Sequence, residues 1–136
     1  MIQIAILGSS KPALEYAHMT LDKTPTARVT IYTEDAEVGF PEAPVLEELV
    51  MREVLDSIPS NWYSSIPEGI DQNIPSTSAS SWLSKSMAIR LASRGARFLL
   101  RTNILNIDED HREVSFRGGG AMRSGVEPYD ELHDFR

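Results

Sequence analysis

The sequence predicts an α/β fold with a mainly parallel sheet, and three observations support this. Residues 2–7 form a short apolar run that ends at Gly8, as a buried parallel strand does. Residues 28–32 are rich in β-branched side chains and predict a second strand. Pro12 suits the first turn of an intervening helix. That helix carries apolar residues at helical spacing, namely Leu14, Ala17 and Leu21. Strand, helix and strand form a βαβ unit, the start of a Rossmann-like fold.

The middle of the chain has weaker patterns. We predict an acidic loop over residues 34–44 and a helix from Pro44 to Pro59, with apolar residues on one face. Residues 59–81 contain many serines and no period, which predicts an extended surface segment. Its two aromatic residues, Trp62 and Tyr63, are expected to pack back on the core, with contact to a ligand or partner as the alternative.

The C-terminal half predicts a helix, a strand and a hairpin. The helix begins at Ser80 or Ser81 and ends at Gly95, and a third strand follows at residues 97–100. The hairpin has strands over 103–108 and 113–116. We expect strand 28–33 to lie adjacent to strand 2–7, with strand 97–101 beside or beyond it. The acidic tail, residues 127–136, has no clear assignment.

Composition narrows the function classes. The 136 residues suit a single domain, residues 1–136. A net charge of −7 argues against nucleic acid or an anionic membrane as the main partner. There is no cysteine, and no apolar run approaches the roughly 20 residues that span a bilayer. Without a basic stretch before the first strand, we expect no signal peptide and a cytoplasmic location.

Other chemistries have little support. The three histidines are scattered; His18 is expected to face solvent, and no metal site is expected. Arg90 and Arg94 fit a solvated helix face. No nucleophile elbow occurs, and no side chain has a persuasive partner for acid, base or nucleophilic work. We therefore name no catalytic residue.

One motif carries chemistry, at the turn between the first strand and the helix. Gly8 allows the sharp turn, Ser10 stands where backbone approaches a pyrophosphate, and Ala13 allows close packing of helix on strand. The N–H groups at the helix start would then point at phosphates. Lys11 could neutralise a phosphate, and Glu34 could accept hydrogen bonds from ribose hydroxyls.

Each of these residues also has an alternative reading. Gly8 could serve the geometry of the turn alone, and Lys11 and Glu34 could be solvated charges. The side chain of Ser10 could donate a hydrogen bond to the pyrophosphate or obstruct it.

The turn and the segments around it resemble the FAD-dependent oxidoreductases that have the glutathione-reductase-like fold. The likeness lies in I-A-I-L-G-S-S-K-P-A-L-E-Y-A followed by R-V-T-I-Y-T-E, and in the helix, Gly, strand and hairpin pattern over residues 82–108. The resemblance implies that backbone near Ile104 holds the adenine. Ser10 replaces the middle glycine of that family, and the later flavin-side motifs are absent. The chain therefore resembles the N-terminal, adenine-side portion of such an enzyme.

Three functions follow from these expectations. The first is a domain that binds the ADP part of a dinucleotide, with FAD favoured over NAD, and with NADP disfavoured because of Glu34. The second is a non-catalytic Rossmann-like module for interaction or oligomerisation, as a homodimer or with a partner subunit. The third is one subunit of a split flavoenzyme, or a fragment of a longer one.

Overall fold

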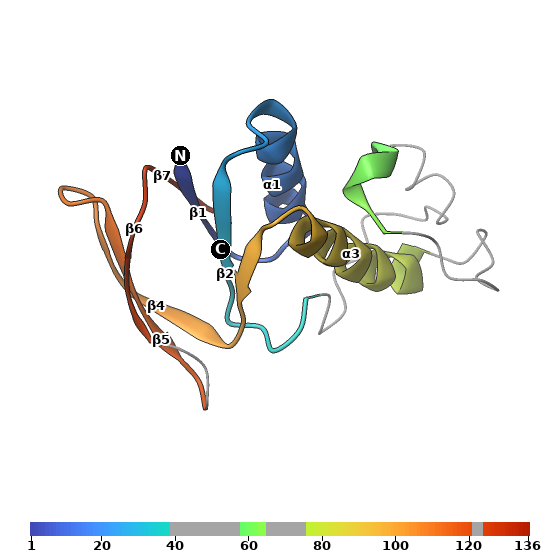
Figure 1. Ribbon diagram of the computed structural model, residues 1–136. Coiled ribbons are helices and arrows are strands. Elements are labelled where there is room, and N and C mark those ends of the chain that lie inside the picture. Colours follow the sequence, from blue (N-terminus) through green and yellow to red (C-terminus); the bar gives the residue numbers. More distant parts are fainter. Residues whose placement is uncertain (39–57, 65–75, 121–123) are drawn as a thin grey trace.

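The computed structural model describes residues 1–38, 58–64, 76–120 and 124–136, and these form three layers (Figure 1). The middle layer is a four-stranded parallel sheet. Two helices cover one of its faces, and a three-stranded antiparallel sheet covers the other. The predicted α/β class with a mainly parallel sheet is confirmed.

The parallel sheet has the order β3-β2-β1-β7, with strands β1 (Gln3–Leu7), β2 (Arg28–Tyr32), β3 (Arg97–Leu99) and β7 (Glu131–Asp134). The predicted pairing of β1 with β2, with β3 beyond β2, is therefore confirmed. In register, Ile6 of β1 lies between Ile31 of β2 and His133 of β7. Because all four strands run the same way, their carboxyl ends meet at one edge of the sheet.

Two helices, α1 (Lys11–Lys23) and α3 (Ser76–Ser93), pack on one face of the sheet. The core between them holds alternate residues of the strands and the apolar stripes of the helices. Its members include Ile4, Ile6, Val29, Ile31, Leu14, Ala17, Leu83, Met87 and Leu91. Helix α3 begins at Ser76, earlier than predicted, and Gly95 follows its end with φ +97°, as expected of a C-terminal cap.

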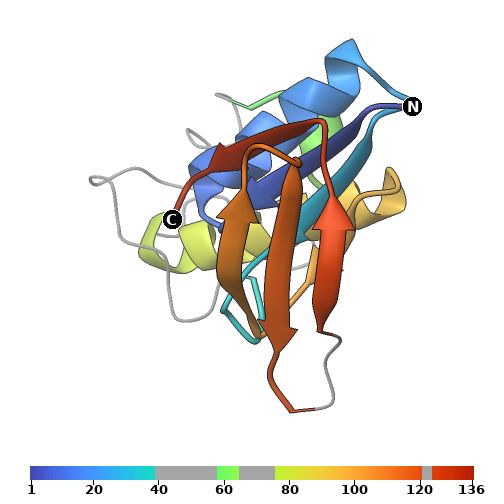
Figure 2. The same cartoon turned by 90° about the vertical axis from the view of Figure 1, so that its left-hand side faces the viewer.

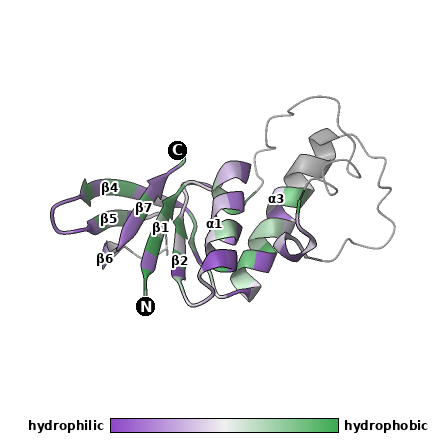
Figure 3. Cartoon of the chain, turned by 90° about the horizontal axis from the view of Figure 1, so that it is seen from above, coloured by the Kyte–Doolittle hydropathy of each residue, from purple (hydrophilic) through white to green (hydrophobic). Residues whose placement is uncertain are grey.

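The other face of the parallel sheet is covered by strands β4 (Thr102–Asp108), β5 (Glu113–Gly118) and β6 (Gly125–Pro128) (Figure 2). The predicted hairpin is present as β4 and β5, and β6 adds a third strand. Figure 3 shows mainly hydrophobic residues along β1 and a mixture of hydrophobic and hydrophilic residues on α1, as expected of a central strand and a surface helix. A second core lies between the two sheets, where Phe116 contacts Tyr32 with ring centroids 5.3 Å apart.

The tail that had no clear assignment returns to the parallel sheet. Two hydrogen bonds precede the pairing: the N–H of Asp130 donates to the backbone carbonyl of Gln3 at 2.7 Å, and the N–H of Gln3 donates to the side-chain carboxylate of Asp130 at 2.6 Å. Strand β7 then pairs along β1. The tail thus completes the sheet on the side of β1 away from β2.

The segment around residue 60 confirms one expectation. A short 3₁₀ helix, η1 (Ser60–Trp62), buries Trp62 against the helical core, and Tyr63 packs beside it. The predicted helix from Pro44 to Pro59 lies almost wholly outside the described residues. None of the helices described is long and apolar enough to cross a membrane.

His18 does not face solvent as predicted, because it is fully buried on α1. Its ring stacks on Trp62, with centroids 5.7 Å apart. Arg94 is also not a simple solvated charge, since its guanidinium reaches both His18 and Asp22. His18 is therefore a core residue, because Trp62 from a distant segment of the chain covers it.

Candidate functional site

The carboxyl ends of the four parallel strands are held together by backbone hydrogen bonds. The N–H of Gly8 donates to the carbonyl of Tyr32 at 2.7 Å, and the N–H of Thr33 donates to that of Leu99 at 3.0 Å. On the other side of β1, the N–H of Phe135 donates to the carbonyl of Leu7 at 2.8 Å. The residues that follow β1, β2, β3 and β7 therefore form one continuous surface at this edge. In open α/β sheets this edge is where ligands bind.

Gly8 makes the turn that the sequence predicts. Its φ is +106°, a conformation that side chains rarely adopt. A Cβ at this position would also lie 3.4 Å from the carbonyl carbon and oxygen of Phe135 and 3.5 Å from the backbone nitrogen of Arg136. These are ordinary contact distances, so it is the backbone conformation that requires the glycine.

Helix α1 begins directly after this turn with an open N-terminus. Ser10 is the N-cap residue, and its carbonyl accepts the first helical hydrogen bond from Leu14 at 3.0 Å. The Ser10 side chain makes no capping hydrogen bond and is exposed, and the first turn carries no acidic residue. The N–H groups of a first helical turn have no acceptor within the helix. Both the hydroxyl of Ser10 and these N–H groups remain available to an anion.

Ala13 has the packing role that the motif predicts, since it is fully buried against the sheet. Any larger side chain there would push α1 away from β1. Lys11, the first helical residue, is half-buried beside the turn. It makes no ion pair or side-chain hydrogen bond with the described residues.

A ring of three hydrogen bonds joins the turn after β1 to the loop after β2. Ser9 is buried, and its hydroxyl donates to the Asp35 carboxylate at 3.0 Å. The hydroxyls of Ser9 and Thr33 are 2.9 Å apart, and the N–H of Asp35 donates to the Thr33 hydroxyl at 3.2 Å. Because the Ser9 proton goes to Asp35, Thr33 must donate to Ser9.

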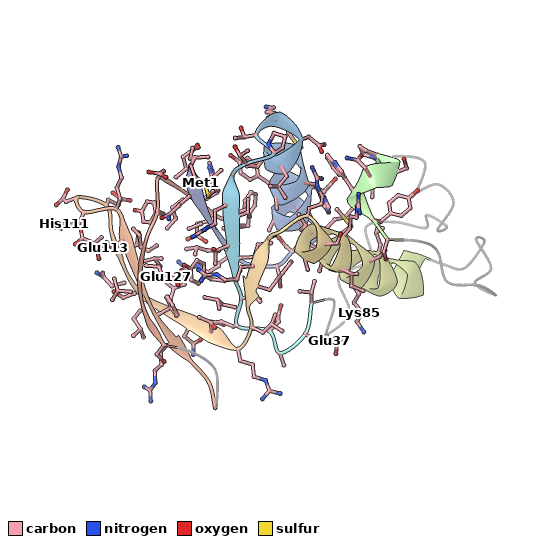
Figure 4. The ribbon with its side chains drawn as sticks, viewed as in Figure 1. Met1, Glu37, Lys85, His111, Glu113 and Glu127 are labelled. Carbon is pink, nitrogen blue, oxygen red and sulfur yellow. The ribbon has the colours of Figure 1, made fainter. Side chains whose placement is uncertain are left out.

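Sequence reasoning missed this ring, because it considered Glu34 alone among the residues after β2. The available signal was the run Thr33, Glu34, Asp35 opposite two consecutive serines. Asp35 turns inward to Ser9, whereas the neighbouring Glu34 is exposed. Further along, Glu37 pairs with Lys85 of α3 at 2.9 Å (Figure 4).

Arg136 supplies a positive charge at the same edge. Its guanidinium is held by Asp134 through two hydrogen bonds, from Nε at 3.0 Å and from Nη2 at 2.9 Å. These bonds raise the pKa of Arg136, and the negative charge of Glu34 raises it further. The pKa of Asp134 is correspondingly lowered, chiefly by its hydrogen bond from Arg136.

Ile104 is connected to this edge through the start of β4. The N–H of Thr102 donates to the carbonyl of Thr33 at 2.8 Å, and the N–H of Arg101 donates to that of Asp35 at 2.9 Å. Ile104 follows two residues later and is half-buried in the second core. The pairing of β4 with β5 shifts register directly after it. The structure thus brings β4 to the loop that carries Glu34, on the side of β2 away from Gly8.

No group of three metal-binding side chains occurs among the residues described here. The chemistry that this edge offers is hydrogen bonding and charge: backbone donors at α1, hydroxyls at Ser10, and a carboxylate at Glu34. Such a set binds and orients a polar ligand. It contains no paired acid and base.

Known structures share this arrangement. A geranylgeranyl bacteriochlorophyll reductase-like protein from Thermoplasma acidophilum matches 98% of the chain with a TM-score of 0.65 and 12% identity. The water-forming NADH oxidase of Lactobacillus brevis, bound to NADH, matches 98% with a TM-score of 0.62 and 18% identity. The flavin-dependent halogenase CmlS matches 91% with a TM-score of 0.55 and 18% identity.

The chain spans only 39%, 24% and 27% of these three proteins, respectively. No family model matches the sequence, and no curated protein matches it. The likeness confirms, at the level of the fold, the predicted resemblance to FAD-dependent oxidoreductases. The chain has the fold that these flavin- and pyridine-nucleotide-dependent enzymes share over part of their length, consistent with their N-terminal portion.

Proposed function

We propose that residues 1–136 form a single Rossmann-like domain that binds the ADP part of a dinucleotide, with FAD the preferred cofactor over NAD. The observation that carries this proposal is the turn at Gly8. It places an uncapped helix start beside the loops that follow β2 and β7. The fold of flavin enzymes over this length supports the choice of FAD.

The chemical groups at this edge match the parts of the cofactor that they would bind. Gly8, Ser10 and the helix start at Lys11 would hold the pyrophosphate, Ala13 would keep the helix close to the sheet, and Glu34 would bind the ribose. The backbone of β4 near Ile104 would hold the adenine, as the resemblance implies. When bound, the flavin ring would supply the electron transfer. The chain's own residues bind and orient the ADP part.

The net charge of the chain is −7, so long-range attraction does not draw an anionic cofactor to it. Affinity must come from the local donors at the turn, aided by Lys11 and Arg136. Glu34 disfavours a phosphate on the ribose, which argues against NADP.

Calorimetric titration of the purified protein with FAD, NAD and ADP tests the proposal. We expect FAD to bind, Ser10→Trp to abolish binding, and Glu34→Ala to weaken it by about tenfold, the loss of one or two hydrogen bonds. Thr26→Trp is the control, since Thr26 is exposed in the loop between α1 and β2. No binding of any of the three nucleotides would contradict the proposal.

A second candidate is an interaction module, favoured by the position of β7. This strand is one of the two edge strands of the parallel sheet and pairs only with β1 among the described strands. An unpaired edge is a template for another strand. A partner subunit or a second copy of the chain could cover it. Sedimentation at several concentrations, together with absence of nucleotide binding, would favour this candidate over the first.

A further inference from the structure

A cavity of about 280 Å³ lies between the two sheets, at the opposite end of the strands from the proposed dinucleotide site. Its walls include the first residue of each of three parallel strands: Gln3 of β1, Arg28 of β2 and Arg97 of β3. Strand β6 contributes the opposite wall, which contains Glu127. The cavity is therefore separate from the edge at Gly8.

The inner part of the cavity is a preformed polar cluster. Arg97 pairs through Nη2 with the Glu127 carboxylate and also donates to the Thr30 hydroxyl at 3.2 Å. The Tyr32 hydroxyl donates to the same Glu127 carboxylate at 3.0 Å. Figure 4 shows Glu127 in the space between the two sheets. These contacts fix Arg97 in place and neutralise its charge.

Two donors in the cavity wall lack partners. The Nε of Arg97 is buried and has no hydrogen-bond partner among the described residues. A buried donor left unpaired is costly, and such a group calls for a missing acceptor. Arg28 is exposed and makes no ion pair with the described residues, so its charge is uncompensated. The cavity thus has one net positive charge in a chain whose net charge is −7.

The remaining lining is mainly polar, and Ala5 on β1 contributes a small apolar part. The volume lies just below the range for small-molecule pockets, roughly 300–1,000 Å³, so the ligand must be small. The planar guanidinium groups suit a carboxylate, which can accept two parallel hydrogen bonds. A small ligand with one carboxylate matches both the charge and the mainly polar lining.

We propose that this cavity binds a small monocarboxylate, whose carboxylate is held by Arg28 and Arg97. A small rotation of the Arg97 guanidinium toward the ligand would give its Nε an acceptor. The site is distinct from the proposed dinucleotide site, because Arg28 and Arg97, which hold the ligand, begin β2 and β3, and of the cavity lining only Tyr32 also belongs to the edge at Gly8.

The test is an NMR titration of the whole chain with sodium benzoate at constant ionic strength. We expect saturable shifts of amide signals at Arg28, Thr30 and Val126. Arg28→Gln should weaken benzoate binding by about tenfold, the loss of one charge-assisted contact. The matched control is Arg117→Gln, on the exposed outer side of β5, which should leave binding unchanged.

Other outcomes would overturn the proposal. These are an absence of saturable shifts, or equal losses in Arg28→Gln and Arg117→Gln, which would indicate charge screening alone. Inorganic phosphate is the second probe: binding of phosphate but not benzoate, with the same dependence on Arg28, would overturn the carboxylate assignment. A parallel titration with FAD separates the two sites, since Arg28→Gln should not alter it.

Discussion

His18 and Trp62 stack inside the fold, with ring centroids 5.7 Å apart and ring planes 11° apart. The histidine makes hydrogen bonds on both sides. Its Nδ1 accepts from Arg94 at 2.9 Å, because arginine can only donate, and so its Nε2 carries the proton and donates to the carbonyl of Met87 at 3.1 Å. The ring is therefore neutral, and it joins α1, α3 and the segment that carries Trp62.

This environment makes the stability of the fold depend on pH. Burial lowers the pKa of His18 from 6.5 to about 4. Between these values the unfolded chain takes up a proton that the folded chain does not, so acid favours unfolding. We expect the free energy of unfolding to be highest above pH 6.5 and to fall by about 1–3 kcal/mol as the pH drops to 4. Urea titrations across this range measure it.

Two histidine variants separate this effect from others. His18→Gln should remove most of the fall between pH 6.5 and 4, whatever its own cost in stability. His111→Gln is the control, since His111 is exposed in the turn between β4 and β5. Its pKa is raised, chiefly by the hydrogen bond to Asp108, so it contributes the opposite slope. A fall that persists unchanged in His18→Gln would contradict the assignment.

Asp22 anchors the same segment from the end of α1. Its carboxylate accepts hydrogen bonds from Trp62 Nε1 at 2.7 Å, from Arg94 at 2.7 Å and from Asn61 at 3.1 Å. Asp22→Asn keeps the size but removes the charge and one acceptor. We expect a loss of about 1–2 kcal/mol in the free energy of unfolding and a shift in tryptophan fluorescence. Asp110→Asn, in an exposed turn, should change neither.

The sequence was sufficient for the elements whose stabilising contacts are local. The βαβ unit follows from the apolar period, and Gly8 and Ala13 follow from the geometry of a strand-to-helix turn. The first hairpin follows from its short turn, and Gly95 from its place after an apolar helix. In each case the pattern and the contact lie within a few residues of one another.

The remaining features depend on contacts between distant segments. His18 resembles an exposed helical residue until Trp62 covers it, and β7 is a short polar stretch until it pairs with β1. The ring of Ser9, Thr33 and Asp35 joins two loops that no sequence period relates. Such contacts are set by topology, which single-sequence patterns do not encode.

Ser9 and Ser10 are neighbours with opposite roles, and this contrast is testable. The Ser9 hydroxyl is buried and bonded to Asp35, whereas the Ser10 hydroxyl is exposed and makes no capping hydrogen bond. Ser9→Ala should lower the free energy of unfolding by about 1–2 kcal/mol, since it leaves buried partners unsatisfied. Ser10→Ala should change it by less than about 0.5 kcal/mol. Denaturation in urea compares the two, and equal losses would mean that the ring does not stabilise the loops.

Gly8 and Gly95 offer a similar matched pair. Both have a positive φ, +106° and +97°, but a Cβ would meet the backbone of Phe135 at Gly8 and nothing within 4 Å at Gly95. Alanine at either position should cost about 1–3 kcal/mol of stability from backbone strain. Only Gly8→Ala places this strain beside the start of α1, and so should also reduce FAD affinity there. Calorimetric titration of both folded variants with FAD tests this: equal FAD affinity would remove the turn at Gly8 from the binding site, whereas a loss confined to Gly8→Ala would support its place there.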